Sequence, residues 1–584
     1  MKELQYLNKY FHKYRYRLIA GIVISILSRY LAVKVPEIVK NSINVADDFR
    51  NGIITDTSLV KSELIQNIAI ILGLAILSGF FTFLMRQTII VTSRLIEFDL
   101  KNEIFLQYER LSLNFYKRNR TGDLMNRISE DVGKVRMYFG PAVMYTINML
   151  VLFSVAVFKM IQIDVKLTLY TLLPFPLLSL SIFILSKIIH KRSTIVQEYL
   201  SKLTTAGQEV FSGINVIKSY STEFQIVEDF EALSNKSKEK NIHLYKAQAL
   251  FFPMMILLIG ISNLIVLYIG GMQYIKGYIS IGTIAEFFMY VNMLTWPVAI
   301  VGWVTSTIQQ AEASQKRINE FLEQIPEISN GPLQIQNLEN AIEFKNVSLT
   351  YDDTRITALK NINFTVQKGE TIAILGNTGS GKSSILNLVS RLYDTSEGSV
   401  SMNGTKIQEY ELSSLRNIIG FVPQDPFLFS DSIENNIKFG AESATEEEIK
   451  TAAKDAVIHD NISEFNHGYQ TVLGERGITV SGGQKQRISI ARALIKDPEI
   501  LIFDDCLSAV DTETEEKILE NLKRISTDKT TFIVSHRVSS AKNADKIIVL
   551  EEGRILQQGT HKELLCQDGY YKELYQQQLL EKEN

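Results

Sequence analysis

The chain has 584 residues, which is enough for two or more domains. Its formal net charge of −3 argues against a nucleic-acid-binding protein, and we expect no nucleic-acid partner. The two cysteines, Cys506 and Cys566, exclude a disulfide framework, and no CxxC or His/Cys metal-binding spacing occurs. We expect no cleavable signal sequence, because the first apolar run lacks a small-residue cleavage pattern.

The first half of the chain is rich in apolar segments that are long enough to cross a bilayer. About 20 apolar residues cross the hydrocarbon core as a helix, which satisfies its own backbone hydrogen bonds. The sequence predicts six such helices, at about residues 18–38, 64–93, 137–158, 167–186, 247–275 and 281–311. The first is the weakest, because Arg29, Lys34 and Glu37 interrupt it. We therefore expect a membrane domain over residues 1–320.

The charges outside these segments predict the orientation in the membrane. Six spans place both chain ends on one side, and the Lys/Arg cluster at residues 2–17 indicates that this side is the cytoplasm. The connections 86–136 and 187–246 are then cytoplasmic. They are polar with helical periodicity, so we expect them to continue the membrane helices into water. The prediction is a multi-pass protein of a bacterial cytoplasmic membrane.

Charged or polar side chains within a span are candidates for function, because the bilayer core does not solvate them. Such side chains are found in the first and last spans, at Arg29, Lys34, Glu37, Glu286 and Asn292. They could line an internal transport path. Equally, those of the first span could reach to the membrane surface or pair with one another.

After the last predicted span, the composition changes to that of a soluble α/β protein. Pro326 and the Gly331–Pro332 pair break the helix that leaves the membrane, so we expect a linker over residues 321–340. A second domain is predicted over residues 341–574, followed by a C-terminal tail over 575–584.

The strongest local motif of this domain is GNTGSGKS, which follows a strand-like apolar run and precedes a helix-like run. It matches the P-loop pattern G-x-x-x-x-G-K-[ST] in its required context. Backbone N–H groups of such a loop wrap phosphates, Lys382 is expected to reach the β- and γ-phosphates, and Ser383 to hold Mg²⁺. The residues of the loop expected to bind ATP are Gly376, Asn377, Thr378, Gly379, Ser380, Gly381, Lys382, Ser383 and Ser384.

A second apolar run, ILIFDD at residues 500–505, ends in two aspartates. A buried strand would deliver Asp504 to the metal side of a P-loop site. The two motifs together predict an ATPase with ATP and Mg²⁺ as cofactors. Cys506 follows, either as a small packing residue or as a redox-sensitive thiol.

Between these motifs lies VSGGQKQRISIARAL, at residues 480–494. This segment resembles the LSGGQ signature of ATP-binding cassette (ABC) proteins, with Val480 in place of Leu. In that family the signature contacts the ATP held by an opposing P-loop, so the resemblance implies two ATPase domains that enclose two ATP molecules. The signature residues here are Ser481, Gly482, Gly483 and Gln484.

Further segments resemble ABC motifs in the same order. The resemblance implies that Tyr351 stacks on adenine, and that Asp511, in SAVD (508–511), belongs to the D-loop. TVLGERG (471–477) resembles the loop that senses the membrane domain in exporters. The resemblance also implies catalytic roles for Gln424, His536 and Asp505, and Mg²⁺ ligation by Ser383, Gln424 and Asp504.

The membrane half also resembles ABC exporters. Residues 115–132 and 212–223 resemble the two cytoplasmic loops whose short coupling helices touch the ATPase domains. The implied fold is a multidomain membrane protein, with an all-α six-helix membrane domain that has long cytoplasmic helix extensions, followed by an α/β P-loop ABC ATPase domain. The chain would be a half-transporter that needs a second half.

Asp505 departs from the family pattern, in which the residue after the Mg²⁺ aspartate is usually a Glu that activates water. Aspartate is shorter by one C–C bond, about 1.5 Å, and a misplacement of about 1 Å can cost about 10²-fold in rate. We therefore expect slow hydrolysis at this P-loop. The pattern resembles the weakened subunit of heterodimeric multidrug ABC exporters, whose partner carries the intact Glu.

The leading prediction is ATP-driven efflux of hydrophobic or amphipathic molecules, such as drugs or lipids, by one half of a heterodimer. His536 is intact, however, which leaves open a homodimeric exporter or lipid flippase that uses Asp505 as a slower base. A further alternative is a regulatory or channel-like protein in which ATP gates a passive pore.

Overall fold

The computed structural model describes residues 3–583 except 475–476, 478 and 508–509. The chain divides into two compact units. The first comprises Met1–Glu109 and Gly122–Gln324, and the second comprises Arg110–Thr121 and Ile325–Asn584.

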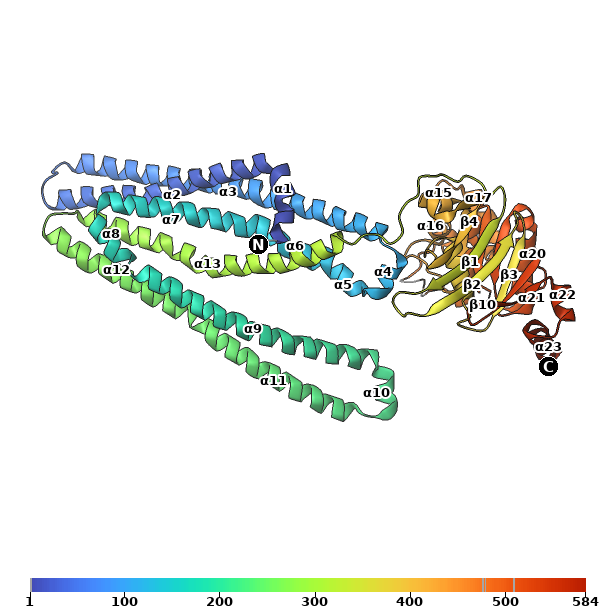
Figure 1. Ribbon diagram of the computed structural model, residues 1–584. Coiled ribbons are helices and arrows are strands. Elements are labelled where there is room, and N and C mark those ends of the chain that lie inside the picture. The colour runs from blue at the N-terminus through green and yellow to red at the C-terminus, as the bar shows by residue number, and fades with distance from the viewer. Residues whose placement is uncertain (1–2, 475–476, 478, 508–509, 584) are drawn as a thin grey trace. The chain divides into compact units, whose positions relative to one another are not determined.

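The first unit is built from helices (Figure 1). After a short 3₁₀ turn, Glu3–Leu7, they are α1 (Asn8–Lys13), α2 (Arg15–Arg50), α3 (Thr57–Arg110), α5 (Thr121–Asn126), α6 (Val132–Met137), α7 (Val143–Ile163), α8 (Val165–Leu172), α9 (Pro174–Ser212), α10 (Ile214–Tyr220), α11 (Glu223–Ala249), α12 (Phe251–Ile275) and α13 (Ile281–Leu322). Two π-helical turns, Arg127–Asp131 and Tyr138–Ala142, join α5, α6 and α7 into one continuous stretch.

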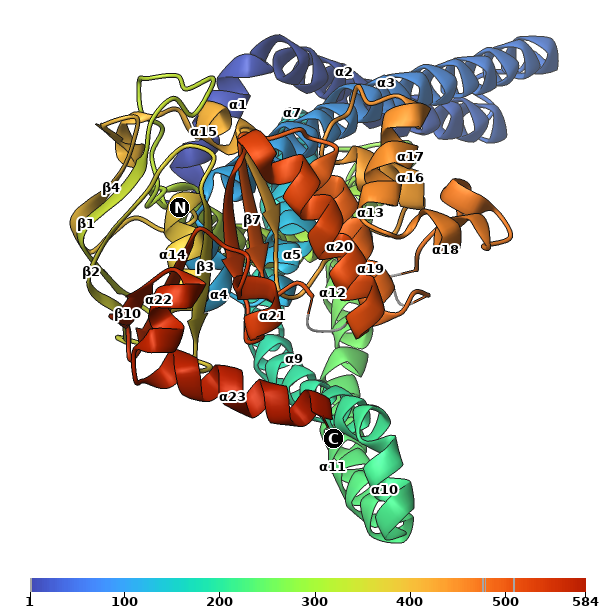
Figure 2. The same ribbon diagram turned by 90° about the vertical axis from the view of Figure 1, so that its right-hand side faces the viewer.

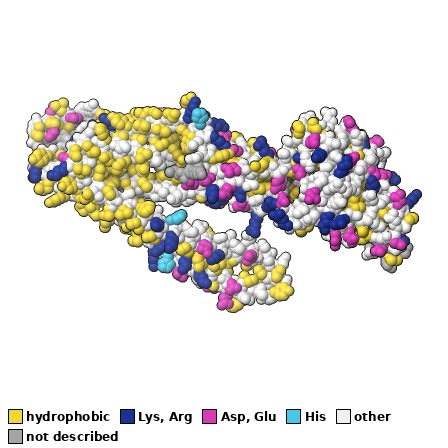
Figure 3. Space-filling model, viewed as in Figure 1, with side chains coloured by type: hydrophobic (Ala, Val, Ile, Leu, Met, Phe, Trp, Pro, Cys, Tyr) yellow, Lys and Arg dark blue, Asp and Glu magenta, His cyan; other side chains and the backbone are white. Residues whose placement is uncertain are grey.

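Among the described residues, six helical stretches are long and apolar enough to cross a membrane. They are Arg15–Arg50, Thr57–Arg110, Thr121–Ile163, Val165–Ser212, Glu223–Ile275 and Ile281–Leu322. Each contains one predicted span and extends beyond it. The prediction of six membrane helices with long helical extensions is therefore confirmed, and Figure 3 shows the hydrophobic side chains that cover the spanning part of this unit.

Helix α13 is the central packing element of the first unit. Its buried residues Phe287, Tyr290, Val291 and Leu294 recur at intervals of three and four, which places them on one face of the helix. They form one core cluster with Val33 of α2 and with residues of α7, α9 and α12. This packing fixes the helices around the cavities described below.

Helices α9 and α11 form a long hairpin that is closed by α10, and its tip extends away from the other helices of this unit (Figure 1). Charged side chains gather along the hairpin in Figure 3. Large hydrophobic residues are exposed near its tip, including Phe211, Tyr220 and Phe224, which are 79%, 77% and 83% exposed. The tip includes the segment 212–223 that was expected to carry a coupling helix.

The second unit begins with α4 (Leu113–Arg118), which lies between α3 and α5 in the chain but belongs to this unit by its contacts. Its strands are β1 (Ile342–Thr350), β2 (Thr357–Val366), β3 (Thr371–Gly376), β4 (Glu397–Met402), β5 (Thr405–Lys406), β6 (Ile419–Val422), β7 (Ile500–Asp504), β8 (Thr530–Val534), β9 (Lys546–Glu551) and β10 (Arg554–Gly559). Its other helices are α14 (Lys382–Val389), α15 (Leu412–Asn417), α16 (Ile433–Lys438), α17 (Glu446–Asp455), α18 (His459–Ser463), α19 (Gly482–Leu494), α20 (Thr512–Ile525), α21 (Val538–Ala541), α22 (His561–Cys566) and α23 (Tyr570–Glu583).

Within the described residues, these strands form two sheets. One has four antiparallel strands in the order β2-β1-β4-β5, and the other has six in the order β10-β9-β3-β8-β7-β6. In the larger sheet, β9, β3, β8, β7 and β6 are parallel, and β10 is antiparallel to β9. Parallel strands that are buried on both faces read as continuous apolar runs, as ILIF in β7 does.

Helix α14 lies between the two sheets, and α19 and α20 cover the other face of the larger sheet (Figure 2). Strand β7 shows this division within five residues. Ile500 and Ile502 belong to the core cluster around α14, whereas Leu501 and Phe503 belong to the cluster around α19 and α20. Successive side chains of a strand point to opposite faces, so this alternation is expected. The predicted α/β domain is confirmed.

Candidate functional site

The predicted nucleotide-binding residues meet at the carboxyl ends of the parallel strands. The P-loop follows β3, Gln424 follows β6, Asp504 ends β7, and His536 follows β8. These strands are neighbours in the sheet, so four segments far apart in the sequence converge at one edge. Ligands of open α/β sheets bind at this edge.

The P-loop backbone adopts conformations that only glycine takes readily. Gly376, Gly379 and Gly381 have φ of 145°, 83° and 102°. A Cβ at Gly376 would collide with the backbone carbonyl of Leu550. Lys382 begins α14, and its Nζ donates to the carbonyls of Gly376 (2.8 Å) and Asn377 (3.0 Å). The loop therefore folds around the lysine that was predicted to reach the phosphates.

Ser383 and Asp504 lie side by side, as a shared Mg²⁺ site requires. The Ser383 hydroxyl donates to Asp504 Oδ1 at 2.9 Å, and Asp504 is buried. Mg²⁺ in nucleotide sites takes oxygen ligands, usually one or two protein carboxylates together with phosphates and waters. The donor set fits that requirement, with Gln424 as the further oxygen ligand predicted from the sequence. A bound Mg²⁺ would neutralise phosphate charge at this edge.

Asp505 lies at the centre of the predicted catalytic residues. Its Oδ2 accepts from Gln424 Nε2 at 3.4 Å and lies 3.9 Å from His536 Nε2. Its backbone N–H donates to the carbonyl of Val534, at the end of β8 (2.9 Å). Its φ of 45° is left-handed, a region that Asp enters more readily than most residues. The site thus holds the shorter carboxylate in a defined position, 9% exposed.

Burial shifts the ionisation of the charged residues at this edge. Removal from water raises the pKa of Asp504, and the Asp505 charge raises it further, although the Ser383 hydrogen bond lowers it. Burial likewise raises the pKa of Asp505, against smaller lowering effects of His536 and Lys382. Burial lowers the pKa of Lys382. All three charged forms are therefore costly here, which favours binding of a charged ligand that compensates them.

Tyr351, predicted to stack on adenine, lies beside the P-loop helix. Its hydroxyl is 2.9 Å from the Ser384 hydroxyl, and its ring meets the Tyr393 ring edge-on, with centroids 5.1 Å apart. Lys117 of α4 rests over both rings, with Nζ 4.9 Å from the Tyr351 centroid and 5.1 Å from that of Tyr393. Lys117 belongs to the segment 115–132, which was predicted to form a coupling loop, but its contact with the predicted adenine site was not predicted from the sequence. No sequence motif indicated that Tyr393 would lie beside Tyr351.

Gln578, on α23, is a further residue near the site that the sequence did not predict. Its side-chain oxygen accepts from the Val538 N–H (2.8 Å), and its Nε2 donates to the carbonyl of His536 (2.9 Å). This glutamine therefore holds the loop that carries the predicted switch histidine. Because it lies some 40 residues after that loop in the chain, only the tertiary structure reveals it.

The signature forms the exposed start of α19. Ser481 caps the helix: its hydroxyl accepts from the Gln484 N–H (3.3 Å), and Gln484 Oε1 accepts from the Ser481 N–H (3.0 Å). Ser481 and Gly482 are exposed and Gly483 is half-buried. Within the residues that the structure describes, no hydrogen bond or ion pair joins them to the P-loop of the same chain. This end of α19 is thus open to another molecule.

The D-loop aspartate caps a different helix. Asp511 accepts from the Thr514 N–H (3.0 Å) at the start of α20, and that hydrogen bond lowers its pKa. Ser508 and Ala509 of the same motif lie outside the described residues, as do Glu475 and Arg476 of the segment 471–477.

Comparisons with known proteins account for both units. The family described as ABC transporter transmembrane region matches residues 18–298, and the family described as ABC transporter matches residues 359–508. The chain is 34% identical to the multidrug resistance-like ATP-binding protein MdlA of Escherichia coli, over 90% of each chain. It is also 34% identical to the probable multidrug resistance ABC transporter ATP-binding/permease protein YheI of Bacillus subtilis, over 99% of this chain and 98% of that protein.

The chain is an ABC exporter. A solved structure of a bacterial Atm1-family ABC exporter with ATP bound superposes with a TM-score of 0.80 at 26% identity, covering 97% of this chain and 98% of that one. The exporter is a multi-pass protein of the cytoplasmic membrane and an ATPase coupled to transport. ABC exporters work as dimers in the bilayer, so this chain supplies one half of the transporter.

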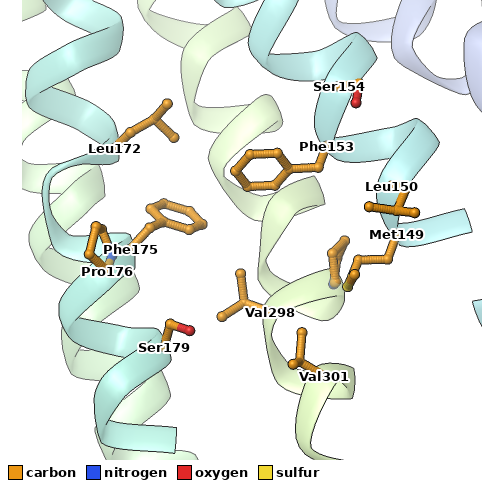
Figure 4. Close-up of a pocket in the computed structure, with 11 residues that line it drawn as sticks. Met149, Leu150, Phe153, Ser154, Leu172, Phe175, Pro176, Ser179, Val298 and Val301 are labelled. Atoms are coloured by element: carbon orange, nitrogen blue, oxygen red, sulfur yellow. The ribbon is translucent and has the colours of Figure 1, made fainter. Parts of the chain in front are cut away.

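The membrane unit of the exporter contains an apolar cavity of about 430 Å³. Helices α7, α8, α9 and α13 line it, and Figure 4 shows Phe153, Phe175 and Val298 pointing into the space between them. Ser154 and Ser179 are polar residues at its edge. Such a lining suits a hydrophobic molecule with few polar groups.

Most of the charged residues predicted within the first and last spans have partners of opposite charge. Glu37 lies 3.1 Å from Lys159 and 3.9 Å from Lys34. Glu286 is buried, lies 3.2 Å from Lys40 and accepts from the Tyr290 hydroxyl at 3.0 Å. Of the alternatives for Lys34 and Glu37, this arrangement favours pairing. Asn292 donates to a backbone carbonyl of its own helix and is exposed.

Proposed function

We propose that this exporter chain is the weakly hydrolysing half of a heterodimer that exports hydrophobic or amphipathic molecules. The observation that carries the proposal is Asp505, which stands where the family usually has Glu. Aspartate brings its carboxylate about 1.5 Å less far from the backbone. A shortfall on the order of 1 Å can reduce a rate by about 10²-fold.

The rest of this ATP site supports nucleotide binding. Lys382 and Ser383 lie at the P-loop, the Ser383 hydroxyl donates to Asp504, and Tyr351 lies beside the P-loop helix. We therefore propose that this P-loop binds ATP with Mg²⁺ and holds it for long periods. Bound ATP would keep the two ATPase domains together at this site.

The signature supports a role in the partner's ATP site. Ser481 and Gln484 form a complete capping box, so the helix N-terminus that would face a γ-phosphate is well ordered and open. On this proposal, Ser481, Gly482, Gly483 and Gln484 complete the site in which hydrolysis occurs. The partner carries the catalytic Glu.

The cargo class rests on the membrane cavity and on the relatives. The lining in Figure 4 is aliphatic and aromatic with two serines, which suits a molecule that is mostly apolar. The relatives at 34% identity are described as multidrug proteins. We propose drugs or lipids as the cargo.

A homodimer remains a second candidate because of one observation. Gln424 and His536 surround Asp505 at 3.4 and 3.9 Å. With Gln424 and His536 in these positions, Asp505 would act as a slower general base in a dimer of two copies of this chain.

The test is the steady-state ATPase rate of the full chain, alone and co-purified with a half-transporter that has Glu after its Mg²⁺ aspartate. We expect the lone chain to be at least about 10²-fold slower than the pair. Within the pair, Ser481→Ala should abolish turnover while Asp505→Ala changes it less than twofold (about 0.4 kcal/mol). If the lone chain turns over ATP briskly and Asp505→Ala stops it, the homodimer is the correct assembly.

A further inference from the structure

A second cavity of about 340 Å³ lies between α2, α7 and α13. Tyr145, Asn148 and Leu152 line it from α7, Trp296 and Ile300 from α13, and Arg29 from α2. Met149 and Pro297 line both this cavity and the apolar one of Figure 4. The two cavities therefore adjoin, so that a guanidinium lies at one side of a largely apolar space.

Arg29 has no carboxylate partner in the part of the chain that the structure describes. Its Nε donates to Asn148 Oδ1 at 3.2 Å, and the Ser25 hydroxyl donates to the same oxygen at 2.7 Å. The carboxylates elsewhere in this region, Glu37 and Glu286, are engaged by lysines. One shared amide oxygen leaves most of the positive charge of Arg29 uncompensated.

The position of Arg29 within the bilayer makes this charge costly. It lies 14 residues after the start of α2 at Arg15, which is about 21 Å along the helix axis. Arg29 is the twelfth of the 21 residues of the predicted span 18–38, which places it near the middle of the segment that crosses the hydrocarbon core, about 30 Å thick. Charged side chains at such depth face the protein interior and mark functional positions. Arg29 points into the cavity and bonds to α7 instead of extending toward a membrane surface.

Guanidinium groups suit carboxylates and phosphates, because their planar N–H groups pair with two oxygens at once. The adjoining space is lined by aromatic and aliphatic side chains and suits an alkyl or aromatic body. A molecule that compensates the charge and fills the space therefore carries an anionic head and an apolar tail.

We propose that Arg29 selects anionic amphiphiles as cargo, by pairing with their carboxylate or phosphate group while the tail occupies the cavity of Figure 4. This inference rests on the proposed export of amphipathic molecules and narrows it to one charge class. Asn148 positions the guanidinium through its side-chain oxygen.

The test uses two photoreactive probes with the same alkyl chain, a diazirine-bearing stearic acid, which carries an anionic carboxylate, and its uncharged methyl ester. The full chain, assembled as it purifies, is placed in phosphatidylcholine nanodiscs, irradiated with each probe and mapped by mass spectrometry. We expect the acid to label peptides containing Met149 or Trp296 about tenfold more than the ester. That factor corresponds to about 1.4 kcal/mol, as one hydrogen bond to a charged group provides.

The variants distinguish an effect of the Arg29 charge from an effect on folding. Arg29→Gln should abolish the preference for the acid, and Arg29→Lys should keep part of it. Asn148→Asp should also abolish it, because the new carboxylate pairs with Arg29 inside the protein. Arg86→Gln is the matched control, since Arg86 is an exposed arginine on α3 and its loss should leave the preference unchanged. Asn148→Asp keeps the test decisive if Arg29→Gln does not fold.

Each outcome bears on one of the two proposals. Equal labelling by acid and ester in the unmodified chain, or a preference that survives both Arg29→Gln and Asn148→Asp, overturns the role of Arg29 but leaves amphiphile export standing. Cavity labelling by neither probe overturns the proposed cargo class as well. Adding phosphatidylglycerol to the nanodiscs identifies the source of the anion: if it displaces the acid, membrane phospholipid is a ligand of the same site.

Discussion

At the residue scale, the proposed role of this chain depends on a single methylene, because Asp505 stands where the family usually has Glu. Asp505 keeps the contacts expected of a catalytic carboxylate, with Gln424 and His536 nearby. Its side chain nevertheless reaches less far from the backbone. The ATPase rate therefore distinguishes the heterodimer from the homodimer better than the presence of a sequence motif does.

A residue-scale prediction concerns the two thiols. Burial raises the pKa of Cys506, so at any given pH a smaller fraction of it is thiolate, the reactive form. Cys566 is exposed. We expect iodoacetamide at pH 8 to modify Cys566 in the folded exporter and to spare Cys506, which mass spectrometry of tryptic peptides measures. Reaction of both thiols at similar rates without denaturant would instead support the alternative that Cys506 is a redox-sensitive thiol.

At the element scale, helices hold loops that carry the chemistry. Helix α4 brings Lys117 onto the Tyr351 ring, and α23 brings Gln578 onto the loop of His536. In each case a helix distant in sequence contacts a residue of the predicted nucleotide site. Movements of these helices and occupancy of the site are therefore expected to influence each other.

The element-scale prediction tests the hold of α23 on the switch loop. Gln578→Ala removes the acceptor of the Val538 N–H and the donor to the His536 carbonyl. Each such hydrogen bond contributes about 1 kcal/mol, so amide exchange at Val538 should accelerate about fivefold to tenfold. Hydrogen–deuterium exchange with mass spectrometry measures this. Gln576→Ala, at an exposed position of the same helix, is the control and should leave the exchange unchanged.

At the scale of the whole molecule, the chain exposes surfaces that a half-transporter needs for its second half. The signature at the start of α19 is open, and Phe211, Tyr220 and Phe224 lie exposed near the tip of the α9–α11 hairpin. Contiguous exposed hydrophobic residues usually mark an interaction site. We expect the hairpin tip to be covered in the assembled dimer.

Cysteine labelling measures that coverage. In a Cys566→Ser background, Tyr220→Cys should react with a polar maleimide at least about tenfold more slowly in the assembled transporter than in monomeric chain, because the partner covers it. Lys236→Cys, an exposed position farther along α11, should react equally in both. Equal reaction of Tyr220→Cys in both states would show that the tip stays free.

The sequence alone determined the elements and their chemistry. Apolar runs of bilayer length predict helices wherever they occur, since hydrocarbon leaves the backbone no other partner. The P-loop, Asp504 and the signature are likewise local patterns, because a phosphate-binding turn needs glycines and a lysine at fixed spacing. The resemblance that these motifs carry led to the ABC exporter family, which the comparisons confirm.

Only the tertiary structure decided which distant residues meet. Gln578 contacts the loop of His536, and Lys117 contacts Tyr351, through long-range packing that no periodicity encodes. The first span offered Arg29, Lys34 and Glu37 as equal candidates. In the packed structure, Glu37 forms an ion pair with Lys159 of α7, whereas Arg29, among the described residues, bonds only to the side-chain amide of Asn148 on the same helix. Sequence spacing fixes a residue's place along its own helix, whereas its charge balance depends on the neighbouring helices that pack against it.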